Sequence, residues 1–463
     1  MEVVPRVKDC LIRMDEISHK SRSVMRLAVI VGIFLASQGV AGAFTGRVVD
    51  ASTKKPIAGA LVTMGDNVVH TDPNGVFRID GSGASVGIRA SGYSRQEVAL
   101  TVGKTGTQEI QLSSFSPKAL YLSFYGVGST ALRDPALKLI ESTELNALVM
   151  DIKGDRGMIP YKSSVALAAE IGAQKITTVK DMQSLLGSFR EKRIYTIARI
   201  VVFKDNPLAV AKPDLAVKTR AGGVWRDRED LAWVDPFRKE VWDYNIDVAE
   251  EAAKLGFDEI QFDYMRFPDT PGLEFSQANT ETNRIKAITG FLAEAKKRLA
   301  PYNVFLTADT FGYVLWNLND TQIGQKLEEI APLVDYMAPM LYPSGFQYGI
   351  PDYRNPVAHP YEIVYLSLKR ARERTGLPSS HFRPWLQAFA DYAFDRRVFG
   401  GKEIRSQIAA ADTFGSNGWM LWNPRNHYSD EGLRNRSNGS VNSARLNWPL
   451  GKPFASLFRF FWR

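Results

Sequence analysis

Eight short apolar segments alternate with helix-length stretches over residues 116–430, and this alternation limits the possible folds more than any other feature of the chain. The segments lie at 120–125, 147–151, 195–202, 259–264, 304–309, 334–341, 383–389 and 418–422. A strand that is followed by a helix returns to its sheet in the parallel direction. Eight such units predict an α/β fold, a (β/α)8 TIM barrel.

One helical stretch shows the periodicity clearly. From Phe237 to Leu255, apolar residues recur at spacings of three and four, which is the period of an α-helix. Asp235 has the side chain of an N-cap, Pro236 suits the first helical position, and Gly256 is typical of a helix end. We therefore predict a helix between Asp235 and Gly256, directly before the fourth strand.

The fourth strand alternates apolar and polar residues. Ile260 and Phe262 are expected to face the helices, so Glu259, Gln261 and Asp263 are expected to point into the barrel. Buried polar groups are costly unless they are hydrogen-bonded. Asp263 comes last, at the carboxyl end of the strand, where barrel enzymes hold their catalytic residues. It is therefore the first candidate catalytic residue.

Two further strands also end on an aspartate. Asp151 closes the second segment and Asp309 closes the fifth, next to the strand of Asp263. Two carboxyl groups at one barrel mouth are the parts needed for acid/base or nucleophilic cleavage of a glycosidic bond. We predict Asp263 and Asp309 as the catalytic pair and Asp151 as a substrate-binding residue, with pairing to Arg199 or Lys153 as its structural alternative.

Other polar and aromatic residues fall at the same strand ends or on the loops that follow them. The predicted substrate-binding residues besides Asp151 are Arg199, Arg266, Trp225, Tyr342 and Trp422. Flat aromatic faces stack on the apolar faces of sugar rings, although each aromatic residue taken singly can equally be core packing. Arg266 is interpreted as holding the charge of Asp263 or a substrate carboxylate, or as a surface residue. Glu259 is interpreted as structural, with a salt link to Arg199.

The segment 44–114 has a different texture, with about seven short strand-like runs separated by turn residues. This pattern predicts a β-sandwich. The sequence Asp72-Pro73-Asn74-Gly75 predicts a tight turn, because proline presets φ and glycine relieves a left-handed position.

Residues 1–43 contain a predicted export signal. Arg26 precedes an apolar run of about ten residues, and Ala41-Gly42-Ala43 predicts cleavage before Phe44. The run is short for a membrane span, which needs ~20 apolar residues. Met25 is a possible true start. The protein is thus expected to be exported to the periplasm or the cell exterior, and the single cysteine, Cys10, would leave with the signal.

Charge and composition narrow the possible partners. The formal charge is +8 among 463 residues, but the basic residues are scattered, which favours a solvated surface over nucleic-acid binding. Five histidines without an H-E-x-x-H pattern predict no metal centre, although an all-oxygen calcium site stays open. No cofactor is predicted.

Several sequence motifs resemble known families. GRVVD (46–50), PIAGA (56–60) and TDPNGVF (71–77) resemble the carboxypeptidase regulatory-like domain, which implies a prealbumin-like sandwich without catalytic residues. NALVMDIK (146–153), GFDEIQFDYMRFP (256–268), DYMAPMLYP (335–343) and RPWLQAF (383–389) resemble a bacterial glycosyl hydrolase domain family. That resemblance implies a barrel distantly related to amylase-like enzymes and a nucleophile at Asp263. The acid after strand five is commonly glutamate in such enzymes, and Asp309 departs from that pattern.

The expected function is therefore hydrolysis of glycosidic bonds in a polysaccharide or oligosaccharide. Two alternatives stay open: a carbohydrate-binding protein on a degenerate barrel, and a structural protein of the cell envelope. In the tail, 431–463, the polar stretch 434–440 is expected to be a loop or linker. The aromatic, basic end at 453–463 is expected to pack on the barrel or to touch a membrane or cell-wall surface.

Overall fold

The computed structural model describes residues 40–100 and 107–436. Cys10, Met25, most of the predicted signal segment and the aromatic end of the tail lie outside the described residues. In the described part, no helix has the length and apolar character needed to cross a membrane.

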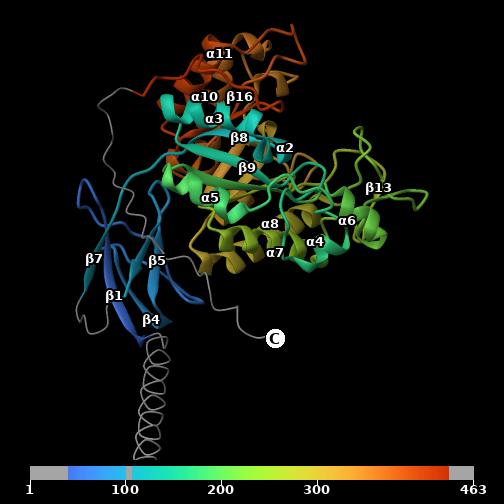
Figure 1. The fold of residues 1–463 in the computed structure, drawn as a ribbon. Helices are drawn as coiled ribbons and strands as arrows, with labels where there is room; N and C mark the ends of the chain where they lie inside the picture. Colours follow the sequence, from blue (N-terminus) through green and yellow to red (C-terminus); the bar gives the residue numbers. More distant parts are fainter. Residues whose placement is uncertain (1–39, 101–106, 437–463) are drawn as a thin grey trace, which may run out of the picture.

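Eight parallel strands close a barrel in chain order, which confirms the predicted fold (Figure 1). The strands are β8 (Lys118–Leu122), β9 (Ala147–Lys153), β10 (Tyr195–Val201), β12 (Glu259–Asp263), β14 (Phe305–Phe311), β15 (Tyr336–Met340), β16 (Trp385–Gln387) and β17 (Trp419–Trp422). The last strand, β17, pairs with the first, β8, so no edge is left unpaired within the barrel.

Helices surround the barrel, and the ring of strands separates an outer apolar layer, under the helices, from an inner one. The helices are α2 (Phe124–Gly128), α3 (Thr130–Ser142), α4 (Ala166–Glu170), α5 (Met182–Glu191), α6 (Asn206–Ala211), α7 (Lys239–Leu255), α8 (Glu281–Leu299), α9 (Leu327–Ile330), α10 (Pro360–Thr375) and α11 (Gly401–Phe414). As predicted for β12, Ile260 and Phe262 join the layer between strands and helices, where Phe262 lies 4.9 Å from the ring of Phe291. A separate apolar cluster, which includes Tyr121, Ile197 and Trp385, fills the barrel interior.

The structure corrects several predicted boundaries. Helix α7 begins at Lys239 rather than after Asp235, whose carboxylate instead accepts hydrogen bonds from the backbone of Phe237 and Ser276. The first barrel strand ends at Leu122, because the following residues form α2. Strands β9 and β14 run two residues beyond Asp151 and Asp309, so only β12 ends on its aspartate.

The N-terminal part is a sandwich of two sheets, as predicted. Its strands are β1 (Val40–Asp50), β2 (Leu61–Met64), β3 (Asn67–His70), β4 (Val76–Gly83), β5 (Ser85–Arg89), β6 (Gln96–Ala99) and β7 (Gln108–Leu112), in the orders β4-β1-β7 and β3-β2-β5-β6. Gly75 has φ +74°, and a Cβ there would lie 2.4 Å from the Val48 carbonyl, so the turn requires glycine. Cleavage before Phe44 would remove the first four residues of β1, and that cleavage site remains a prediction.

The sandwich lies against the amino-terminal ends of the barrel strands (Figure 1). Arg95 contacts the carboxylate of Asp258, with Nη2 3.1 Å from Oδ1, just before β12 begins. The backbone N–H of Gly92 donates to the Tyr336 hydroxyl at 2.8 Å, at the start of β15. The sandwich therefore covers the end of the barrel opposite to the carboxyl ends of the strands, which stay open for a site.

Candidate active site

A cavity of about 270 Å³ lies at the carboxyl ends of the barrel strands. The strands contribute Arg199, Asp263, Asp309 and Trp422, and the loop after β15 contributes Tyr342. With Arg266 from the loop after β12, the barrel brings together six of the eight predicted site residues, although they are up to 223 positions apart in the chain (422 − 199). This is the end of the barrel at which TIM-barrel enzymes carry out catalysis.

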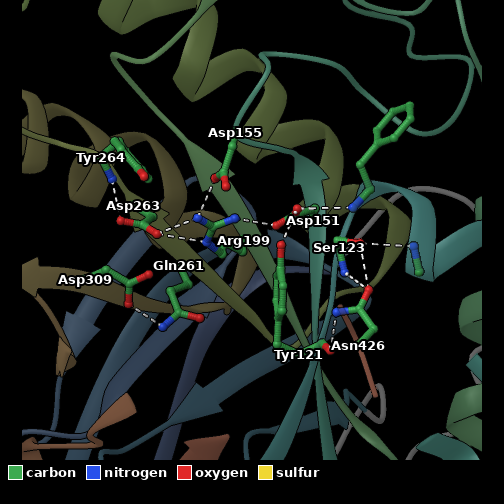
Figure 2. A network of polar contacts seen from close by, with 12 residues as sticks. Tyr121, Ser123, Asp151, Asp155, Arg199, Gln261, Asp263, Tyr264, Asp309 and Asn426 are labelled. Atoms are coloured by element: carbon green, nitrogen blue, oxygen red, sulfur yellow. Dashed lines mark hydrogen bonds and ion pairs between the residues drawn. The ribbon is translucent and has the colours of Figure 1, made fainter. Parts of the chain in front are cut away.

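Arg199 is the centre of a buried network of carboxylates (Figure 2). Its guanidinium donates to Asp151 at 2.6 Å, to Asp155 at 2.8 Å and to Asp263 at 2.6 Å. Asp155 is the most open of the three, with 38% of its side chain exposed. One buried cation therefore faces three carboxyl groups, which the planar fork of arginine can bind simultaneously.

Asp263 receives three hydrogen bonds. Arg199 donates twice to Oδ2, from Nε at 2.9 Å and from Nη2 at 2.6 Å, and the backbone N–H of Tyr264 donates to Oδ1 at 2.6 Å. These donors match the acceptor-only oxygens of a carboxylate. Tyr264 has φ +48°, so a non-glycine residue occupies the left-handed region directly after the key aspartate. Such strain is concentrated at functional sites.

Asp309 has a contrasting environment. Its Oδ1 accepts from Gln261 Nε2 at 2.6 Å and from Trp385 Nε1 at 2.8 Å, whereas Oδ2 is buried and has no hydrogen-bond partner among the described residues. Burial, followed by the charge of Asp263, raises the pKa of Asp309 well above its usual range. With two donors on Oδ1, a proton on this carboxyl group belongs on Oδ2.

Asp151 lies behind Arg199 and is not among the residues that line the cavity. Its carboxylate accepts from Arg199, from the Tyr121 hydroxyl at 2.7 Å and from the Phe124 backbone at 3.1 Å. Burial raises its pKa to about 6 despite the opposing effect of Arg199. The alternative pairing with Arg199 is therefore observed, while Lys153 pairs with Asp205 at 2.6 Å.

Aromatic residues shape the cavity wall. The Trp422 ring stacks on Tyr121 with centroids 3.9 Å apart, and the Arg199 guanidinium lies 4.9 Å from the Trp422 centroid. The hydroxyl of Tyr342 is buried without a hydrogen-bond partner in the described part of the chain. Its pKa is raised well above its usual range by burial and by the charges of Asp309 and Asp263.

Trp225 lies outside the cavity, whereas Arg266 lines its edge. Trp225 lines a second hollow of about 440 Å³ beside the cavity, and Arg266 lines both spaces. Arg266 forms no ion pair with Asp263 among the described residues. Its guanidinium instead lies over Trp233 at 4.9 Å and over Tyr264 at 5.3 Å.

The salt link predicted between Glu259 and Arg199 is wrong. Glu259 is fully buried at the opposite end of the barrel and pairs with Arg383 at 2.7 Å, not with Arg199. Asp155 is the clearest residue that sequence reasoning left out of the site. Asp155 could have been found from its position, because it lies two residues after Lys153, in the loop that follows the strand of Asp151.

Family comparison agrees with this geometry. A family model described as "Putative glycosyl hydrolase domain" matches residues 119–428. The chain belongs to this family. A second model, the carboxypeptidase regulatory-like domain, matches residues 43–113, so the suspected two-part architecture of a glycosyl hydrolase domain behind a sandwich is confirmed. No curated protein matches the chain.

Two solved structures are similar to this chain, and the first of them shows the same fold. The glycoside hydrolase domain of PgaB (BpsB) from Bordetella bronchiseptica is 12% identical, with a TM-score of 0.51, and the match covers 67% of this chain and 95% of that one. A hypothetical protein from Ruminiclostridium thermocellum ATCC 27405 is 42% identical over 41% of this chain and 96% of that one, with a TM-score of 0.37.

Proposed function

We propose that this protein hydrolyses glycosidic bonds, with Asp309 as the general acid and Asp263 as the nucleophile or base. The observation that carries the proposal is the difference between the two carboxyl groups on neighbouring strands. Asp263 receives hydrogen bonds on both oxygens, whereas Asp309 keeps one buried, unpartnered oxygen and a raised pKa. Two carboxyl groups with environments that push their protonation apart are what acid/base cleavage of a glycoside requires.

The roles follow from the atoms. Protonated Asp309 would donate from Oδ2 to the oxygen of the leaving sugar, and Asp263 would attack the anomeric carbon or activate a water. Arg199 is a positioning residue, since it orients Asp263 through two hydrogen bonds. Asp151 would stabilise Arg199 from behind rather than bind substrate, which refines the role predicted from the sequence.

The two alternatives fit the site less well. A purely structural envelope protein predicts no clustered acidic site at the mouth, yet three carboxyl groups converge on Arg199 there. A binding protein without catalysis has no need for a carboxyl group with a raised pKa beside a charged one. We further propose that the protein acts outside the cytoplasm, because residues 25–43 have the pattern of a secretory signal.

Turnover of two kinds of glycoside tests both roles. Wild-type protein, Asp263→Asn and Asp309→Asn are compared on a panel of polysaccharides and on aryl glycosides whose leaving groups need no protonation. Asp263→Asn should lose about 1,000-fold in kcat/KM on both kinds, whereas Asp309→Asn should lose that much only on the polysaccharide.

The pH profile provides the control for Asp309. Because its pKa is raised, wild-type activity should fall as the pH rises through that pKa and the proton is lost. Asp309→Asn should lack this alkaline limb on aryl glycosides. Wild-type protein that binds sugars without releasing reducing ends would favour the binding protein, and equal activity of all three proteins would mean that other carboxyl groups act.

A further inference from the structure

The second hollow directly adjoins the catalytic cavity. It lies between the loop after β10 and the loop after β12, which are joined by the short strands β11 (Lys218–Thr219) and β13 (Leu273–Glu274). Its volume is about 440 Å³, and it shares Tyr264 and Arg266 with the cavity. The two spaces therefore meet at Tyr264 and Arg266, directly after Asp263 in the chain.

Three aromatic rings in mutual contact line this hollow. The rings of Trp225 and Trp233 lie 6.2 Å apart, and Trp233 packs edge-on against Tyr264 at 5.6 Å. Trp233 is buried, and its Nε1 is held by Asp227 at 2.9 Å, whereas Trp225 is half-buried and faces the hollow. The Trp225 ring is thus available for stacking on a sugar.

The charges of the hollow favour an anion. The lining holds four cations, Lys204, Arg226, Arg228 and Arg266, against three carboxylates, Asp227, Glu229 and Asp269. Lys204 contacts both Asp227, at 3.2 Å, and Glu229, at 3.1 Å, so its single charge is committed to this pair. Within residues 40–100 and 107–436, Arg228 and Arg266 form no ion pair. Of the remaining groups, Arg226 contacts Asp230 at 3.8 Å, and the exposed Asp269 offsets one charge.

Arg266 is the preorganised member of this set. Its half-buried guanidinium lies near the Trp233 and Tyr264 rings, with Cζ 4.9 Å and 5.3 Å from their centroids, and one Nη1 hydrogen bond to the Phe267 carbonyl at 3.0 Å holds it in place. A guanidinium that is fixed on aromatic faces loses little entropy when its free edge binds a carboxylate by two hydrogen bonds. The catalytic cavity next to it holds several aspartates and would repel the same group.

We infer that the second hollow is a subsite for a sugar that carries a carboxylate, adjacent to an uncharged sugar at Asp263 and Asp309. The inference rests on the proposed function and names its substrate class, a glycan that contains both acidic and neutral sugars. Trp225 would stack on the acidic sugar, and Arg266 with Arg228 would bind its carboxylate.

Binding of matched oligosaccharides tests the subsite. The full-length Asp263→Asn protein is titrated by calorimetry at low salt with three pairs of hexasaccharides: cellohexaose and a form oxidised at C6 of a single sugar, carboxyl-reduced hyaluronan and hyaluronan, and xylohexaose with and without glucuronic acid. In at least one pair the acidic member should bind about tenfold more tightly than the neutral one. Adding Arg266→Gln or Arg228→Gln should abolish that difference. The matched control is Arg78→Gln, an exposed arginine of the sandwich, which should change neither affinity.

The subsite is overturned if no acidic member binds more tightly than its neutral partner, or if Arg266→Gln and Arg228→Gln leave the preference intact. This failure is distinct from failure of the proposed function. Hydrolysis of a neutral oligosaccharide by the wild type, without any preference for acidic sugars, would support the proposed glycosidase activity and refute the subsite. An acidic preference without any hydrolysis by the wild type would do the reverse.

Discussion

Two buried arginines lie at opposite ends of the same barrel, and they differ in the number of carboxyl groups that surround them. At the amino-terminal end, Arg383 pairs with a single carboxylate, Glu259, and both side chains are 0% exposed. At the open end, Arg199 faces Asp151, Asp155 and Asp263. The first cluster is balanced in charge, and the second carries a surplus of carboxyl groups.

The balanced cluster has every donor satisfied. Arg383 also donates to the carbonyl and side-chain oxygens of Asn417, and Glu259 accepts from the hydroxyls of Tyr195 and Thr307. The open cluster, in contrast, is next to buried polar atoms that lack partners, Asp309 Oδ2 and the Tyr342 hydroxyl. The comparison teaches that a buried charge marks a functional site only when its network is left incomplete, because a complete network has nothing to offer a ligand.

The largest expected effect is a loss of stability when the arginine at the amino-terminal end is replaced. Arg383→Met leaves Glu259 buried without a charged partner, so the free energy of unfolding should fall by about 3–5 kcal/mol. Urea unfolding of the full chain measures it. The double variant with Glu259→Leu removes the stranded charge and should recover part of the loss. A single variant as stable as the wild type would refute a structural role for this pair.

The same substitution at the open end should act mainly on catalysis. Arg199→Met removes the two hydrogen bonds that orient Asp263, so kcat should fall by about 100-fold. Steady-state kinetics at a pH where the variant is folded provide the measurement. A variant with unchanged kcat would show that Arg199 serves folding alone, like Arg383.

The stability of Arg199→Met should also depend on pH. Asp151 has a folded-state pKa of about 6, above its ordinary 3.8, so its contribution to stability is present below 3.8 and is lost as the pH rises through about 6. Arg199 lowers that pKa, and its removal should raise it further. The stability deficit of the variant should therefore be larger at pH 8 than at pH 5, whereas the deficit of Arg383→Met should not follow the titration of Asp151.

The smallest effect concerns the sandwich that covers the closed end. Arg95→Ala removes the cation beside the buried Asp258, and the free energy of unfolding should fall by about 2 kcal/mol. Activity at a temperature where the variant is folded should be unchanged, because the contact lies at the end opposite to the catalytic cavity. Arg78→Ala, which removes an exposed pair with Asp80, should change stability by less than about 1 kcal/mol. Equal effects of the two variants would contradict a stabilising interface.

Most of the fold could be predicted from the sequence. Alternation along β12 predicted the inward direction of Glu259, Gln261 and Asp263, since side chains alternate across any strand. It could not predict that Glu259 pairs with Arg383 rather than Arg199. Both arginines point inward, and only the order of residues along each strand, combined with the stagger of the closed barrel, places one at each end.

Local pattern also misjudged where elements begin. Asp235 and Pro236 have the residue types of a helix start, but the carboxylate of Asp235 is bonded to Ser276, from a distant loop, and the helix begins at Lys239. A capping residue can bond any backbone N–H within reach, and the tertiary fold decides which one is nearest.

By itself, then, the sequence determined the two-part architecture, the end of the barrel that holds the site, and the candidacy of Asp263 and Asp309. These depend on periodicity and on strand polarity, which are local properties of the chain. Only the tertiary structure decided that Asp151 lies behind Arg199, that Asp309 keeps one oxygen without a partner, and that Trp225 belongs to a second hollow. Those facts depend on distances between residues far apart in the chain and on their exclusion from water, which no local pattern records.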